Sequence, residues 1–192
     1  MARPQAFNTE EALHGALSVF WRKGYEATSL ADLLAATGLS KSSLYATFGD
    51  KRSLFLAAFD AYRQARRREA DHRFDTGPAR QTIEAFFRSI IADAGAPGDC
   101  HGCMSINQAV ELAPHDADIR GRVEADLQFI EDALARTIAR GQAEGSVKST
   151  RSARALARLM IVAFPGFQVT VRAGADRARL EDALGLLLAN LD

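Results

Sequence analysis

The sequence has few of the residues that build β-strands. Its 192 residues include only 7 Val, 8 Ile and 3 Tyr, against 36 Ala and 20 Leu. Valine, isoleucine and tyrosine are enriched in sheets, whereas alanine and leucine favour helices. A large sheet is therefore excluded, and the composition predicts an all-α fold.

Long apolar runs and cysteine are scarce as well. The most promising apolar run, Leu159 to Phe164, stops at Pro165, well short of the roughly eighteen residues that a membrane span needs. The chain starts with MARPQAFNTEE, which has neither the apolar core nor the cleavage site of a signal peptide. We therefore expect a cytoplasmic protein without membrane contact, whose two cysteines are reduced thiols.

Neither sign of charge is in excess, because 24 Lys and Arg balance 24 Asp and Glu. The distribution is uneven: residues 1–73 carry 11 basic and 8 acidic side chains, and residues 74–192 carry 13 and 16. A mildly basic amino-terminal part is compatible with nucleic-acid binding there, although so small an excess does not establish it.

Apolar spacing and capping residues predict nine helices. The expected helices run from Asn8 or Thr9 to Gly24, from Thr28 or Ser29 to about Ala36, from Ser40 to Tyr45 or Thr47, from about Lys51 onward, from Gly77-Pro78 onward, from Cys103 to Ala113, from Asp116 onward, from Ser149 or Thr150 to about Arg172, and from Asp176 onward.

The last two helices carry more apolar side chains than one inward face needs. Leu159 to Phe164 and Leu186 to Leu188 spread apolar surface over more than one face. Deep burial within one chain would explain this, and so would a subunit interface. Because terminal helices seldom lie at the centre of a small fold, we expect a homodimer in which these helices of both chains form a four-helix bundle.

Residues Thr28 to Phe48 form a pattern of helix, glycine turn and second helix: TSLADLLAATGLSKSSLYATF. This is the layout of a helix-turn-helix, whose second helix presents its first residues to base edges in the major groove. Gly38 permits the positive φ of a sharp turn. The amides at the helix starts near Ser29 and Ser40 suit phosphate oxygens. An ordinary helical hairpin with a solvated serine-rich end is the alternative.

The first 62 residues resemble the DNA-binding domain of the TetR (tetracycline repressor) family of bacterial transcription regulators. The resemblance rests on the segments FWRKGYEATSLADL, TGLSKSSLY and TFGDKRSLF. It implies an Ω-shaped homodimer with a helix-turn-helix domain over residues 1–50 and an effector-binding and dimerisation domain over residues 51–192. The helix from about Lys51 would link the two domains, and double-stranded operator DNA would be the partner.

Carried over by position, the resemblance implies that DNA is contacted by Thr28, Lys41, Ser42, Ser43, Tyr45, Thr47 and Lys51. Lys41, Ser42, Ser43 and Tyr45 are the side chains that we expect to read bases, and Lys51 is placed to bind the backbone. Many family members have an aromatic residue or histidine where this chain has Thr47, so that phosphate contact is expected to be weaker or differently placed.

The family also implies a cavity for a small organic effector in the carboxyl-terminal domain. Ten aromatic and amphipathic residues could line it: Phe86, Phe87, Ile90, Met104, Asn107, Gln108, Phe129, Phe164, Phe167 and Gln168. The alternative for each of them is a place in the ordinary hydrophobic core.

Cys100-His101-Gly102-Cys103 is the one reactive-looking group of residues. Cys103 is expected at the start of a helix, where the dipole favours the reactive thiolate form of a cysteine. The stretch GCMSINQAVELAPHD resembles one in TetR members that sense electrophiles or oxidants. Cys103, with Cys100, could therefore be a thiol sensor, and an inert apolar thiol is the alternative. A single CxxC lacks the second ligand pair of a zinc site, so we expect no bound metal.

The sequence thus predicts a homodimeric regulator, most often a repressor, that needs no cofactor and is released from DNA by a small organic or electrophilic effector. Two alternatives stay open: a helical enzyme that uses Cys103, and a helical interaction protein that does not bind DNA. The enzyme is disfavoured because nothing in the sequence orients an acid or base beside the thiol.

Overall fold

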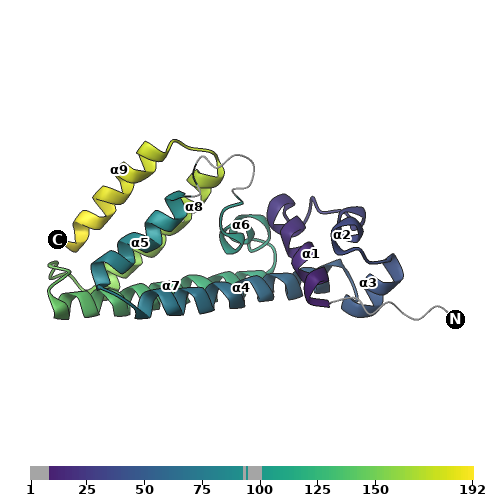
Figure 1. Cartoon of the computed structure of the whole chain (residues 1–192), viewed down its shortest axis with the longest axis horizontal. Coiled ribbons are helices and arrows are strands. Elements are labelled where there is room, and N and C mark those ends of the chain that lie inside the picture. The colour runs from purple at the N-terminus through teal and green to yellow at the C-terminus, as the bar shows by residue number, and fades with distance from the viewer. Residues whose placement is uncertain (1–8, 93, 95–100) are drawn as a thin grey trace. The chain divides into compact units, whose positions relative to one another are not determined.

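Figure 1 shows the computed structural model, which describes residues 9–92, 94 and 101–192. Within these residues the chain forms nine α-helices and a short 3-10 turn and contains no strand, so the predicted all-α fold is confirmed. The helices are α1 (Thr9–Lys23), α2 (Leu30–Thr37), α3 (Lys41–Phe48), α4 (Lys51–Asp75), α5 (Ala79–Ala92), α6 (Met104–Glu111), α7 (Ala117–Glu144), α8 (Ala153–Arg172) and α9 (Arg177–Leu188), followed by η1 (Ala189–Leu191).

The chain divides into two compact units, and the boundary between them lies within α4. Unit 1 extends to Ala65, and unit 2 runs from Arg66 to Asp192. The expected domain boundary, at residue 50, lies immediately before α4, whereas the structural division lies inside this helix. Each unit is described below by itself.

The helix-turn-helix of unit 1 is defined by its capping residues. The Ser29 side chain accepts a hydrogen bond from the amide of Asp32, whose carboxylate accepts one in return from the amide of Ser29, so the two residues form a capping box. Gly38 ends α2 with φ +67°, a conformation that suits glycine. Ser40 then caps α3 through the amide of Ser43.

An aromatic core supports these short helices. The rings of Phe20 and Phe55 meet edge to face with centroids 5.1 Å apart, and Phe59 stacks on Phe55 at 5.8 Å. Leu33 of α2 and Leu44 of α3 are fully buried. Because helices of eight residues are marginal in water, burial of these leucines holds α2 and α3 in their helical form.

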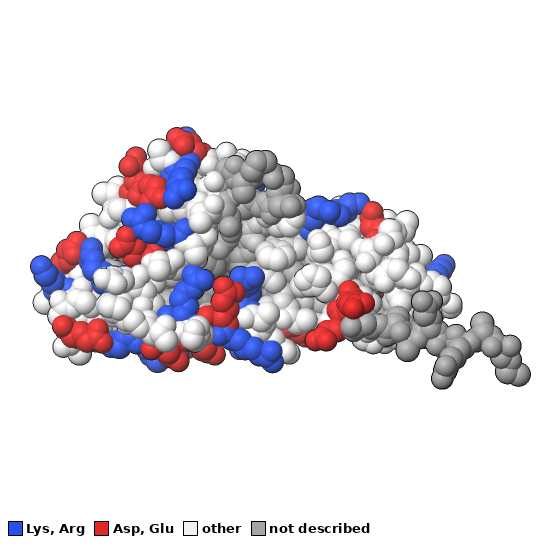
Figure 2. Space-filling view, viewed as in Figure 1, with Lys and Arg blue, Asp and Glu red and all other residues white. Residues whose placement is uncertain are grey.

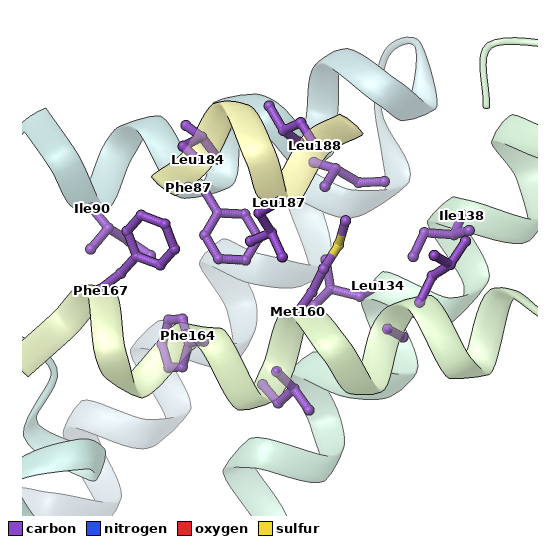
Figure 3. Close-up of a cluster of buried hydrophobic side chains, with 14 of the residues drawn as sticks. Phe87, Ile90, Leu134, Ile138, Met160, Phe164, Phe167, Leu184, Leu187 and Leu188 are labelled. Carbon is purple, nitrogen blue, oxygen red and sulfur yellow. The ribbon is translucent and has the colours of Figure 1, made fainter. Parts of the chain in front are cut away.

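Unit 2 has its own core, which α5, α7, α8 and α9 share. Figure 3 shows the side chains of this cluster, among them Phe87 and Ile90 of α5, Leu134 of α7, and Phe164 of α8. The helix α8 is long and apolar enough to cross a membrane by length and composition alone. It contributes seven buried residues to unit 2, as a core helix does.

The start of α8 differs from the prediction. We expected the helix to begin at Ser149 or Thr150, but it begins at Ala153, with Ser152 at the N-cap position. The amides of Lys148 and Ser149 donate to the carbonyl oxygen of Leu191, at 2.9 and 3.0 Å. These contacts with a residue far along the chain hold the segment in a non-helical connection, so the helix starts later.

A buried carboxylate joins three helices of unit 2. Asp126 of α7 is 7% exposed and accepts a hydrogen bond from the Ser105 hydroxyl of α6 at 2.8 Å. Arg67 of α4 donates to the same carboxylate at 3.2 Å and lies over the Phe129 ring, 5.2 Å from its centroid. Because a buried charge must be paired and hydrogen-bonded, this junction fixes part of α4 against α6 and α7.

Replacing Gly15 of α1 with alanine should destabilise unit 1. A Cβ at Gly15 would overlap the backbone carbonyl oxygen of Ala36, so α1 and α2 would have to separate. We expect a loss of about 1–3 kcal/mol in the free energy of unfolding, the usual cost of overpacking, measured by thermal or denaturant unfolding.

The matched control is Gly121→Ala in α7, because a Cβ there meets no atom within 4 Å. Alanine is the better helix former, so this control should gain up to about 1 kcal/mol. A gain of the same size at both positions would contradict the close approach of α1 to α2.

Candidate nucleic-acid interface

The helix α3 presents a small polar face. Lys41 and Ser42 are exposed, and Tyr45 one turn later is 40% exposed. Leu44, on the opposite side, is fully buried. The short helix therefore turns one side into the core and leaves its first turns accessible to a partner.

Short hydroxyl side chains crowd the start of α3. The Ser40 hydroxyl lies 3.0 Å from that of Ser42 and 2.9 Å from that of Ser43. Further along, Thr47 donates its hydroxyl hydrogen to the carbonyl oxygen of Ser43 at 2.9 Å. Because these side chains are short, a nucleic acid can approach the backbone closely, and a hydroxyl both donates and accepts hydrogen bonds.

The charge at the start of α3 differs from that of its neighbours. Among the described residues of unit 1, α1 has Glu10 and Glu11 in its first turn, α2 has Asp32, and α4 is capped by Asp50. The first turn of α3 has no acidic residue and begins with Lys41. The positive end of its helix dipole is therefore left for an external anion, such as a phosphate.

The start of α2 has a carboxylate of its own chain beside it, so it suits a phosphate less well than the start of α3. The amide of Ser29 already donates to the Asp32 carboxylate at 2.9 Å. Hydrogen bonding to Lys23, at 2.6 Å, and to Ser29 holds the pKa of Asp32 well below its usual range. Because the pKa of Asp32 is lowered, its ionised carboxylate stabilises the folded state at neutral pH. This stabilisation is lost as the pH falls through the lowered pKa. The charge at this helix start is thus already balanced from within the chain.

The ammonium group of Lys51 lies at the start of α4, which follows α3 directly. It sits 4.4 Å from the centroid of the Tyr25 ring, within the range of a cation–π contact. The Lys41 ammonium lies 6.0 Å from the Tyr45 ring on its own helix. Lys41 is thus the first residue of α3, and Lys51 is the first residue of the helix that follows it.

Thr28 is placed differently from the other predicted DNA contacts. Its side chain is 1% exposed, and its hydroxyl donates to the carbonyl oxygen of Gly24. The side chain therefore holds the turn between α1 and α2 and does not reach the surface of unit 1. The other six predicted residues are exposed or half-buried.

Half of the residues predicted to line an effector cavity come together in unit 2. Phe86 stacks on Phe164 with centroids 5.7 Å apart, and Phe87 meets Phe167 at 5.4 Å. Ile90 belongs to the same cluster. These rings from α5 and α8 make a continuous apolar wall, which could serve a ligand or simply form the core.

The other five residues predicted to line the effector cavity do not belong to this group of rings. Met104 is fully buried, and Asn107 donates its side-chain amide to the carbonyl oxygen of His101 at 2.9 Å. Gln108, also buried, donates to Glu111 at 3.1 Å. Phe129 lies beneath Arg67, and Gln168 is half-buried.

Cys103 occupies the N-cap position of α6, so this helix starts where the sequence predicted. The Cys103 side chain is half-buried. Cys100 lies outside the described residues. In the part of the chain that the structure describes, no three His, Cys, Asp or Glu side chains gather in an arrangement that could hold a metal ion.

A separate hollow of about 320 Å³ lies at the carboxyl-terminal end of unit 2. Its lining consists of Lys148, Ser149, Thr150, Arg151, Ala189, Asn190 and Asp192. None of these belongs to the predicted effector set, and their polar side chains do not suit an apolar ligand.

The sequence reasoning missed two residues that organise the sites. Asp126 interrupts the apolar stripe of α7, three residues after Val123 and four before Ile130, and an acid at such a position is a signal of a buried partner. Tyr25 belongs to the segment FWRKGYEATSLADL, but its position beside Lys51 depends on tertiary packing that no spacing rule reveals.

The surface of unit 2 carries both signs of charge interspersed, as Figure 2 shows. Arg88, for example, pairs with Glu84 of its own helix and with Glu181 of α9, both at 2.7 Å. The pair with Glu181 joins α5 to α9, and the interspersed charges leave no field of one sign. Unit 2 therefore offers no comparable surface for a polyanion on the face shown.

Comparison with known proteins agrees with this division of the chain. Residues 12–58 match the family "Bacterial regulatory proteins, tetR family", and residues 78–187 match "Tetracyclin repressor-like, C-terminal domain". The chain is 32% identical over the full length of both proteins to an uncharacterized HTH-type transcriptional regulator, YezE, of Bacillus subtilis. It is 31% identical to the HTH-type transcriptional repressor ComR of Escherichia coli, over 97% of this chain and 90% of that protein.

A solved structure extends the similarity to three dimensions. It is a cysteine mutant of the TetR family transcriptional regulator CifR in complex with a 26 bp double-stranded operator DNA. This structure is 29% identical in sequence, covers 97% of this chain and 98% of its own, and superposes with a TM-score of 0.83. The relatives are transcriptional regulators and not enzymes, which removes the Cys-dependent enzyme as an alternative. The chain belongs to the TetR family of bacterial transcription regulators.

Proposed function

We propose that this protein is a cytoplasmic transcriptional repressor that binds operator DNA as a homodimer and is released by an effector bound in unit 2. The observation that carries the proposal is the start of α3, which has serines and Lys41 but no carboxylate, unlike the other helix starts in the described part of unit 1. The similarity to the repressor ComR and to the operator complex of CifR supports the proposal.

In this proposal α3 lies in the major groove. Lys41, Ser42, Ser43 and Tyr45 face the base edges, where lysine and hydroxyl groups recognise donor and acceptor patterns. Thr47 and Lys51 bind the backbone, which fixes the position of the helix without reading sequence. Thr28 acts indirectly, because its buried hydroxyl holds the turn that precedes α2.

Lys51→Ala and Tyr45→Ala should both weaken DNA binding, but in different ways. Loss of a phosphate contact should lower affinity about equally for all sequences and reduce the slope of log affinity against log salt by about one. Loss of Tyr45 should weaken operator binding about tenfold and relax sequence preference. Gel-shift titration at several salt concentrations, with the region flanking the gene as probe, measures both effects.

Lys148→Ala is the matched control, since this exposed lysine lies in unit 2 and should leave the affinity and the salt slope unchanged. If neither Lys51→Ala nor Tyr45→Ala alters binding, the assigned contacts are wrong. If wild type itself does not bind, the DNA-free interaction protein becomes the better reading.

The homodimer is proposed from an exposed apolar face on the last two helices. Leu159, Val162 and Val169 of α8 are 44%, 76% and 50% exposed, and Leu186 of α9 is 75% exposed. Residues 159, 162 and 169 follow helical spacing, so they form one stripe. A second copy is the fitting occupant, because two copies of α3 are needed to bind two half-sites about one helical turn apart.

Val162→Glu should convert the protein to a monomer, because a charge would enter the apolar stripe at its most exposed valine. Sedimentation or size-exclusion chromatography measures the oligomeric state. Val110→Glu is the matched control, since this valine of α6 is 72% exposed and lies off the stripe. A monomeric wild type, or a dimeric Val162→Glu, would rule out this interface.

For the effector, two chemical classes fit the residues of unit 2. The aromatic wall of Phe86, Phe87, Phe164 and Phe167 suits an apolar organic ligand. A thiol-reactive effector is the second candidate, favoured by the half-buried Cys103 at the start of α6. Either would act by binding more tightly to a conformation that fits DNA less well.

Cys103→Ser should keep basal DNA binding and lose release by a maleimide, whose double bond is attacked by the thiolate. Gel shifts before and after treatment measure the effect, and Cys100→Ser, which keeps Cys103, should still be released. If maleimide does not release wild type, or releases Cys103→Ser equally, Cys103 is not a sensor and the apolar ligand remains.

A further inference from the structure

Tyr25 is held rigidly by the aromatic core of unit 1. Its ring lies 4.9 Å from that of Phe55 and 6.1 Å from that of Phe20, and both of these phenylalanines are fully buried. Tyr25 itself is half-buried and follows Gly24, which ends α1 with φ +85°. One face of a fixed ring is thus turned toward the start of α4.

The Lys51 ammonium lies 4.4 Å from the centroid of this ring. A lysine side chain loses rotamer entropy when it is fixed. An aromatic face attracts an ammonium even at exposed sites. The Tyr25 ring therefore restricts Lys51 before DNA arrives, so less order has to be imposed on binding.

Lys41 offers a contrast within the same unit. Its ammonium lies 6.0 Å from the ring of Tyr45, which is 40% exposed. That pair sits one turn apart on α3, whereas Tyr25 and Lys51 come from separate segments of the fold. Of Lys41 and Lys51, only Lys51 is therefore held by a residue from another segment of the fold.

We propose that Tyr25 is a positioning residue for DNA binding: its ring holds the Lys51 ammonium where that ammonium binds a backbone phosphate. An ammonium carries three N–H donors, and the ring face engages only one side of it, so donors remain for phosphate oxygens. The proposal rests on the proposed function, because it requires that Lys51 contacts DNA.

Fluorinated rings test the electrostatic part of this contact without removing the ring. Tyr25→Phe keeps the negative ring face and should bind the duplex from the region flanking the gene within twofold of wild type. Trifluorophenylalanine at position 25 withdraws charge from the face and should weaken binding about three- to fivefold.

The same series in a Lys51→Met background isolates the pair. If Tyr25 acts through Lys51, the ring substitutions have no further effect once the ammonium is gone. An equal loss in both backgrounds, or no loss in either, overturns the proposal. If wild type binds tightly and the ring substitutions do not change its affinity, only the role of Tyr25 is overturned. If wild type does not bind, the proposed function is overturned as well.

A measurement without DNA checks the geometry independently. The ring current of Tyr25 should shift the ε-methylene protons of Lys51 upfield in the NMR spectrum of the full chain. Tyr25→Leu should remove this shift, and Tyr25→Phe should retain it. Random-coil values for the Lys51 protons in wild type would overturn the proposal, whatever the stability of the leucine variant.

Discussion

Burial of Leu33 and Leu44 inside unit 1 is the constraint on which the candidate nucleic-acid interface depends. Each leucine belongs to a helix of eight residues, too short to persist alone in water. In the same unit, the rings of Phe20 and Phe55 meet edge to face, and α1 approaches the backbone of α2 closely at Gly15. The polar face of α3 is rigid only because its opposite face is buried.

Charge then distinguishes α3 from the helices beside it. In the described part of unit 1, acidic side chains occupy the starts of α1, α2 and α4, where they offset the helix dipoles. At α3 a serine does the capping and leaves the charge unbalanced. Local stability and anion binding compete for the same amides, and among the described helix starts of unit 1 only that of α3 has no carboxylate beside them.

Local signals predicted most of this arrangement. Ser29, Gly38 and Ser40 act through residues two to four positions away, so their capping roles are visible in the sequence. The start of α8 was misplaced because Leu191, more than forty residues away, accepts the amide hydrogens of Lys148 and Ser149. The burial of Thr28 and the pairing of Asp126 with Arg67 likewise depend on tertiary packing. The proposed DNA contacts were inferred from family resemblance, and the structure shows that six of the seven are at least partly exposed.

Methylation protection of the bound operator tests the central claim most directly. Dimethyl sulfate modifies guanine N7 in the major groove and adenine N3 in the minor groove, so it shows which groove the protein covers. The account predicts two groups of protected guanines about one helical turn apart on one face of the duplex, one for each α3. Protection of adenine N3 alone, or an even protection without two centres, would contradict insertion of α3 into the major groove.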